Sequence, residues 1–94
     1  MAYQITWTKR ADETLYKQVE YLAENWSDKV VTTFVDKVYH IVYLLSEFPE
    51  MGQLLDKEKK IRGVLINPNV RLTYQFDGSI ILLLRFTDTR QNTE

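Results

Sequence analysis

The stretch from residue 61 to residue 91 constrains the fold most strongly, because three runs suited to strands are separated by turn-forming residues. The runs are apolar at 61–66, alternating at 70–76 and apolar again at 80–84. Asn-Pro-Asn separates the first two runs, and Asp77-Gly78, a dipeptide typical of a tight type I′ hairpin turn, follows the second. This pattern predicts three antiparallel strands in a meander.

The alternation within residues 70–76 also predicts the two faces of the middle strand. Successive side chains of a strand point to opposite faces of the sheet. One face therefore carries apolar side chains, namely Val70, Leu72, Tyr74 and Phe76, and the other carries Arg71, Thr73 and Gln75. We expect the first face to belong to the core and the second to be free for function.

The N-terminal half predicts one strand and two helices. Residues 2–7 alternate as a half-buried strand, and Thr8 is positioned to cap a helix over about 9–25. Apolar residues spaced by three and four predict a second helix over about 28–46. The connection is short, so the helices should form an antiparallel hairpin.

These elements predict an α+β fold with two layers. Phe48-Pro49 ends the second helix, and 53–60 is a polar connection to the meander. The expected order is β-α-α-β-β-β, in which the helical hairpin packs on a small, mainly antiparallel four-stranded sheet with the first strand at one edge. The chain of 94 residues should form a single domain, 1–94.

Composition excludes several classes of site. The chain has no cysteine and a single histidine, so disulfides and thiolate nucleophiles are ruled out, and we expect no cofactor or metal. The net charge of −1 argues against a surface that is basic throughout. The first residues do not resemble a secretory signal, which favours a cytoplasmic protein without membrane contact.

The order and spacing of several short motifs resemble the RelE/ParE superfamily of bacterial type II toxins. The matching pieces cover nearly the whole chain: Trp7-Thr8, Ala11, Leu15, Tyr21-Leu22, Phe48-Pro49-x-x-Gly52, Ile61-Arg62-x-x-x-Ile66, Val70-Arg71-Leu72-x-Tyr74, Ile80 to Arg85, and Asp88-Thr89-Arg90-Gln91.

The resemblance implies the toxin of a bacterial toxin-antitoxin module, acting in plasmid stabilisation or stress response, that inhibits growth and forms a hetero-oligomer with its antitoxin. RelE-like members are ribosome-dependent mRNA endonucleases, whereas ParE-like members poison DNA gyrase. An inactive relative that only binds a partner protein is a third interpretation.

The resemblance also implies candidate catalytic residues for the nuclease case. Arg71 matches the family's arginine on the third strand, and Arg90 matches the arginine after the last strand. Guanidinium groups bind phosphoryl oxygens in a bidentate manner and stay charged, so they stabilise a phosphorane-like transition state. Weaker candidates are Arg62, Arg85 and Asp88, and the matches at Lys57, Lys59 and Lys60 are looser still.

Each of these candidate residues also has an explanation that involves no catalytic role. Arg62, Arg71 and Arg85 have strand parity compatible with one common face, which is either a phosphate-binding patch or three unrelated surface arginines. Arg85 could instead pair with Asp88 or Glu94, and Lys57–Lys60 could be a solvated loop of mixed charge.

The chain departs from the nuclease pattern in its tail. His40 lies inside the second helix, and Asp88 and Thr89 stand where some relatives carry histidine or an aromatic residue. A neighbouring arginine would lower the pKa of Asp88 and make it a poor base. The sequence therefore favours the ParE-like mechanism slightly.

An antitoxin would need an exposed apolar groove on the helical hairpin or a free sheet edge. Val30, Tyr39 and Met51 are candidates for the lining of such a groove, although core packing would explain them as well. Trp7, Trp26 and most of the tyrosines are expected to fill the core between helices and sheet.

Overall fold

The structure is a computed structural model that describes residues 2–90 of the chain, so Gln91 and Glu94, named above, lie outside the described residues. Two helices follow the first strand, and four further strands complete the chain. The elements are β1 (Gln4–Trp7), α1 (Lys9–Asn25), α2 (Asp28–Glu47), β2 (Gln53–Asp56), β3 (Ile61–Asn67), β4 (Val70–Phe76) and β5 (Ile80–Asp88). Both predicted helices are confirmed, and the end of the second differs by one residue.

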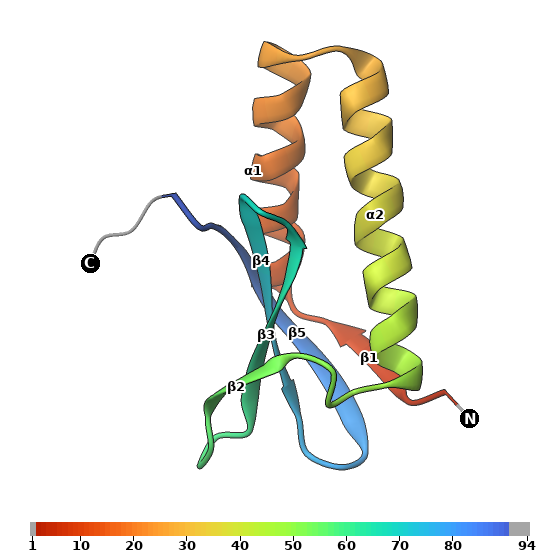
Figure 1. Ribbon diagram of the computed structural model, residues 1–94, viewed down its shortest axis with the longest axis vertical. Helices are drawn as coiled ribbons and strands as arrows, with labels where there is room; N and C mark the ends of the chain where they lie inside the picture. The colour runs from red at the N-terminus through yellow and green to blue at the C-terminus, as the bar shows by residue number, and fades with distance from the viewer. Residues whose placement is uncertain (1, 91–94) are drawn as a thin grey trace.

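The strands form one sheet in the order β1-β5-β4-β3-β2. The strands from β2 to β5 pair antiparallel with their neighbours, and β1 pairs parallel with β5 at the edge. Figure 1 shows α1 and α2 as an antiparallel pair whose connection lies at the opposite end of the molecule from the N-terminus. The predicted two-layer α+β class and the edge position of the first strand are confirmed.

The sheet has five strands because part of the expected polar connection is a strand. β2 spans only four residues, Gln53–Asp56, and pairs antiparallel with β3 at the other edge of the sheet. Its sequence, Gln-Leu-Leu-Asp, does not alternate, so only the long-range pairing with β3 makes it a strand. β5 is also longer than expected, because pairing with β4 continues from Leu83 to Asp88.

The turn between β4 and β5 is not of type I′. That type requires a positive φ at both central residues, whereas in residues 2–90 only Gly78 (φ 100°) and Lys60 (φ 60°) have one. Instead, Asp77 Oδ1 accepts hydrogen bonds from the amides of Ser79 (2.9 Å) and Ile80 (3.0 Å). These hydrogen bonds to the Asp77 side chain close the turn, as in an Asx turn.

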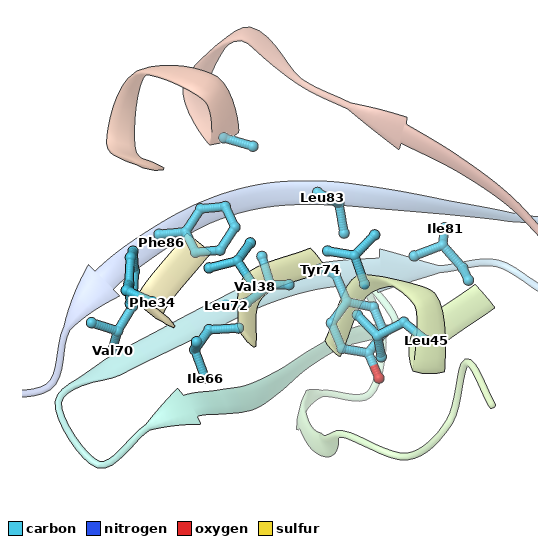
Figure 2. Packing of buried hydrophobic residues seen from close by; sticks show 12 residues of the cluster. Phe34, Val38, Leu45, Ile66, Val70, Leu72, Tyr74, Ile81, Leu83 and Phe86 are labelled. Carbon is cyan, nitrogen blue, oxygen red and sulfur yellow. The ribbon is translucent and has the colours of Figure 1, made fainter. Parts of the chain in front are cut away.

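The core lies between α2 and the face of the sheet that carries Val70, Leu72 and Tyr74, as the alternation predicted. Figure 2 shows side chains from α2 facing those from β3, β4 and β5. The buried hydrophobic residues are Ala11, Phe34, Val38, Val42, Leu45, Ile66, Val70, Leu72, Tyr74, Ile81, Leu83 and Phe86.

The expectation that Trp26 and most tyrosines fill the core is wrong. Trp26 is 60% exposed at the end of α1, because the chain leaves the helix there and the stripe no longer faces the sheet. Tyr16, Tyr21, Tyr39 and Tyr43 are also exposed. Trp7 is half-buried and packs against the core, stacked on Phe86.

Two threonine hydroxyls fix α1 on β5. Thr8 Oγ1 caps the helix by accepting from the amide of Ala11 and donates to the carbonyl oxygen of Leu83 at 2.7 Å. Thr14 Oγ1 accepts from the amide of Phe86 at 2.9 Å. These bonds set the position of α1 relative to the end of β5, where several candidate site residues lie.

Candidate functional site

The register of the strands sorts the candidate arginines by face. Residues paired across antiparallel strands point to the same side of the sheet. Arg71 pairs with Leu65 and Thr87, and Arg85 pairs with Thr73. Arg71 and Arg85 therefore share the face that turns away from the helices, which we call the outer face.

Arg62 does not belong to the outer face, so the hypothesis of one face with three arginines is wrong. It pairs with Tyr74, whose side chain lies in the core beneath the helices. Arg62 Nη1 donates to the carbonyl oxygens of Gly52 (2.8 Å) and Glu50 (3.2 Å). Its guanidinium thus holds the loop before β2, and its role in this structure is structural.

A glycine makes room for Arg71 on the outer face. A Cβ atom added at Gly63 would lie 3.1 Å from Arg71 Cδ and 2.9 Å from Leu55 Cδ1. The aliphatic part of Arg71 therefore passes over Gly63, beside a leucine from the edge strand β2. Sequence reasoning missed Gly63 and Leu55 because it did not expect β2.

Arg90 lies on the other side of the sheet from Arg71. Its guanidinium forms a bidentate pair with Asp88, from Nε to Oδ1 at 3.0 Å and from Nη2 to Oδ2 at 2.9 Å. Asp88 is paired with Val70, whose side chain is in the core, so the Asp88–Arg90 pair lies on the helix side. The fold does not combine Arg71 and Arg90 in one constellation.

The same pair determines the charge of Asp88. The hydrogen bond from Arg90 holds the pKa of Asp88 below its usual value. Asp88 in turn raises the pKa of the Arg90 guanidinium, which is charged in any case. The expectation that an arginine lowers this pKa is confirmed, so Asp88 is a stable carboxylate and a weak base.

The exposed loop between β2 and β3 carries Lys57, Lys59 and Lys60, the residues whose match to the toxin superfamily is loosest. The amide of Lys59 donates to Asp56 Oδ1 at 3.0 Å, and Lys60 has a left-handed backbone. Lys57 and Lys60 border a shallow cleft of about 300 Å³ that also contains Arg62 and the carboxylates of Glu50 and Asp77. The surroundings are thus of mixed charge. His40 is exposed on α2, apart from all of these residues.

A larger cleft opens where the helical hairpin passes the turn between β3 and β4. Its volume is about 540 Å³, and its lining is Gln18, Tyr21, Leu22, Trp26, Ser27, Lys29, Val30, Thr33, Phe34, Lys37, Asn67, Asn69, Val70 and Arg90. Of the three residues expected to line a partner groove, Val30 lies here. Tyr39 lies against Trp7 instead, and Met51 is exposed after α2.

A family model described as "ParE toxin of type II toxin-antitoxin system, parDE" matches residues 5–93. This chain belongs to the ParE toxin family. The match covers all but the first residue of β1, both helices and the whole meander, and it includes every candidate arginine of this ParE-family chain. No curated protein sequence gives a significant match.

Solved structures share the fold at low sequence identity. A chain of the chromosomal ParDE toxin-antitoxin system from P. aeruginosa superimposes with a TM-score of 0.76 at 15% identity, over 93% of this chain and 96% of that one. A chain of the RelBE2 toxin-antitoxin complex from Mycobacterium tuberculosis gives 0.63 at 20% identity, over 94% and 99%. YafQ from E. coli gives 0.63 at 14% identity, over 94% of each chain. The fold is therefore that of the RelE/ParE superfamily.

The described part of the chain offers neither a membrane span nor a metal cluster. Among residues 2–90, both helices are too short or too polar to cross a bilayer. The same residues contain no group of three or more His, Asp or Glu side chains placed to hold a metal ion.

Proposed function

We propose that this ParE-family chain is a growth-inhibiting toxin of the bacterial cytoplasm that poisons DNA gyrase and serves plasmid stabilisation or stress response. Its cognate antitoxin would hold it inactive in a hetero-oligomer. Membership of the ParE family and likeness to toxins of ParDE and RelBE systems support the general role. The choice of gyrase rests on the site itself.

The observation that carries this choice is the bidentate Asp88–Arg90 pair. An RNase that activates a 2′-hydroxyl needs a proton acceptor beside its phosphate-binding cations. Here the tail carboxylate is held by Arg90 on the helix side, while Arg71 and Arg85 lie on the outer face. The chain's one histidine, His40, lies on α2 and is exposed. A toxin that acts by binding its target needs no such base.

A second candidate is a RelE-like mRNA endonuclease, for which the resemblance implies Arg71 and Arg90 as catalytic residues. One observation favours it: Arg71 and Arg85 extend from neighbouring strands on the same face, where two guanidinium groups suit a phosphodiester. In that case Arg71 and Arg85 would stabilise the transition state. Arg90 would serve only through a rearrangement that separates it from Asp88.

The test is inducible expression in a bacterial host, with gyrase-linked DNA breaks and mRNA ends measured in the same cultures. We expect growth arrest with gyrase-linked breaks and intact mRNA. New mRNA ends inside codons, abolished by Arg71→Ala, would show the nuclease instead. Normal growth with soluble, folded protein would indicate an inactive interaction module. The matched control is Arg10→Ala, which removes an exposed arginine from the first turn of α1.

A further inference from the structure

The side chain of Arg71 is held differently from those of Arg62 and Arg90. Hydrogen bonds tie Arg62 to backbone carbonyl oxygens and Arg90 to Asp88, whereas within residues 2–90 none involves the Arg71 guanidinium. Arg71 is nevertheless half-buried, so packing and not hydrogen bonding covers this side chain. Its hydrogen-bond donors therefore remain available to a ligand.

A β-bulge in the edge strand supplies part of this packing. The pairing of β2 with β3 shifts between Leu54 and Asp56, so Leu55 is an extra residue without a partner in β3. A bulge redirects the side chain of its extra residue. Here Leu55 Cδ1 lies 2.9 Å from the point at which a Cβ atom would stand on Gly63. The bulge thus brings a side chain of the edge strand onto the outer face.

The stem of Arg71 meets the same point. Its Cδ atom lies 3.1 Å from the position that a Cβ of Gly63 would take, so Leu55 and Arg71 converge on the space left by the missing side chain. Leu65, the partner of Arg71 on β3, is a second exposed leucine beside the stem. Apolar contacts therefore hold the aliphatic part of Arg71 while its guanidinium stays unpaired within the described chain.

The neighbours of Arg71 on the outer face carry no carboxylate. Strand pairing places Leu65 and Thr87 opposite Arg71, and Gly63 and Arg85 are diagonal neighbours. Arg85 is a second cation, and across residues 2–90 no ion pair joins either arginine to an acidic side chain. A guanidinium group in such surroundings suits a carboxylate, which it binds in a bidentate manner.

We propose that Arg71 binds an acidic side chain of the toxin's protein target, and that Leu55 and Gly63 are the residues that position it. This rests on the proposed function, in which the target is gyrase. Leu55 and Leu65 are 44% and 50% exposed beside Arg71, and an arginine among apolar side chains is typical of the centre of a protein interface. A stem that is already ordered loses less conformational entropy on binding, so this positioning raises the affinity.

The first measurement is the heteronuclear NOE of the Arg71 Nε–H group in the whole purified chain, which reports how ordered the side chain is. We expect Arg71 to be more ordered than Arg10, which is exposed in the first turn of α1. Leu55→Ala should lower the Arg71 value toward that of Arg10. Leu54→Ala is the matched control, since Leu54 is also 44% exposed on β2 but pairs with Arg62 on the helix side. An unchanged Arg71 value in Leu55→Ala would overturn the positioning role.

The second measurement is toxicity, with growth and gyrase-linked DNA breaks compared at equal protein levels. Arg71→Ala should require about tenfold more protein for the same arrest and Leu55→Ala about threefold more, whereas Leu54→Ala should match the wild type. Gly63→Ala should also weaken the toxin, because it displaces Arg71. When Leu55→Ala is added to Gly63→Ala, the new methyl group takes the place of the lost leucine. The double variant should therefore lose less than the two single losses combined.

The two measurements separate this proposal from the proposed function. Undiminished gyrase-linked breaks in Arg71→Ala would overturn the contact with the target. New mRNA ends that disappear in Arg71→Ala would show that Arg71 binds RNA phosphate instead of a protein carboxylate. A wild-type chain that neither arrests growth nor breaks DNA would overturn the proposed function and the target contact together. The NOE comparison would still decide whether Leu55 positions Arg71, because it does not depend on toxicity.

Discussion

The hydroxyl group of Tyr74 donates to the carbonyl oxygen of Pro49 at 2.8 Å and accepts from the amide of Gly52 at 3.0 Å. Arg62 donates to the carbonyl oxygen of Gly52 from the adjacent strand. Two side chains of the inner sheet therefore fix the loop between α2 and β2. Because β2 begins at Gln53, directly after this loop, they also set the position of the edge strand.

Tyr74→Phe should destabilise the fold by about 1–3 kcal/mol, because it leaves the Gly52 amide and the Pro49 carbonyl without their buried partner. Urea unfolding of the purified protein measures the difference. Tyr16→Phe is the control, since Tyr16 is 65% exposed. Equal stability of the two variants would show that these two hydrogen bonds contribute nothing.

The same tyrosine predicts a loss of stability at alkaline pH. Burial raises the pKa of Tyr74 above its ordinary value of 10.0. The pKa of Tyr74 is higher in the folded protein than in the unfolded chain, so the neutral hydroxyl contributes its full stability to the fold below about pH 10. This contribution falls as the pH rises from there through the folded pKa. The difference in unfolding free energy between the wild type and Tyr74→Phe should be constant below pH 10 and shrink as the pH rises above 10. A constant difference would contradict this.

Gly52→Ala should destabilise the fold, whereas Gly63→Ala should leave its stability nearly unchanged and displace Arg71. A Cβ at Gly52 would lie 2.7 Å from the Tyr74 hydroxyl oxygen and 2.8 Å from the Gly63 carbonyl oxygen, which are buried and cannot retreat. We expect a loss of about 1–3 kcal/mol or more. At Gly63 the Cβ meets only the side chains of Leu55 and Arg71, so stability should change little while Arg71 is displaced. Thermal unfolding and growth assays of both variants separate the two effects.

The Asp88–Arg90 pair predicts a weak dependence of stability on acid. The pKa of Asp88 in the folded protein lies below the ordinary value of 3.8. The ion pair therefore stabilises the fold above that pH, and this stabilisation is lost as the pH falls through the folded pKa. Asp88→Asn should lower the urea midpoint slightly at pH 7, and the difference should shrink as the pH falls below 3.8. Glu20→Gln, an exposed change on α1, is the control. A difference that persists in strong acid would argue against the ion pair.

The strand register explains why Arg85 lies on the outer face beside Arg71, as the sequence predicts, whereas Arg62 lies on the helix side. The pairing of β4 with β5 shifts between Thr73 and Tyr74, so Leu84 is an extra residue in β5. This bulge turns Arg85 outward and Phe86 into the core, although Ile81 and Leu83 precede them on the core side. Arg62 lies on the helix side because its partner is Tyr74, a pairing that the spacing of residues does not reveal.

The sequence alone determined the helical hairpin, the three-stranded meander and the core face of β4, because 3.6-residue and two-residue periodicities are local properties of the chain. It also carried the motifs of the toxin superfamily. Only the tertiary structure decided that β2 is a strand, and that Trp26 and three cations, Lys29, Lys37 and Arg90, meet in one cleft. Both depend on pairing or packing between residues far apart in the chain, which periodicity does not encode.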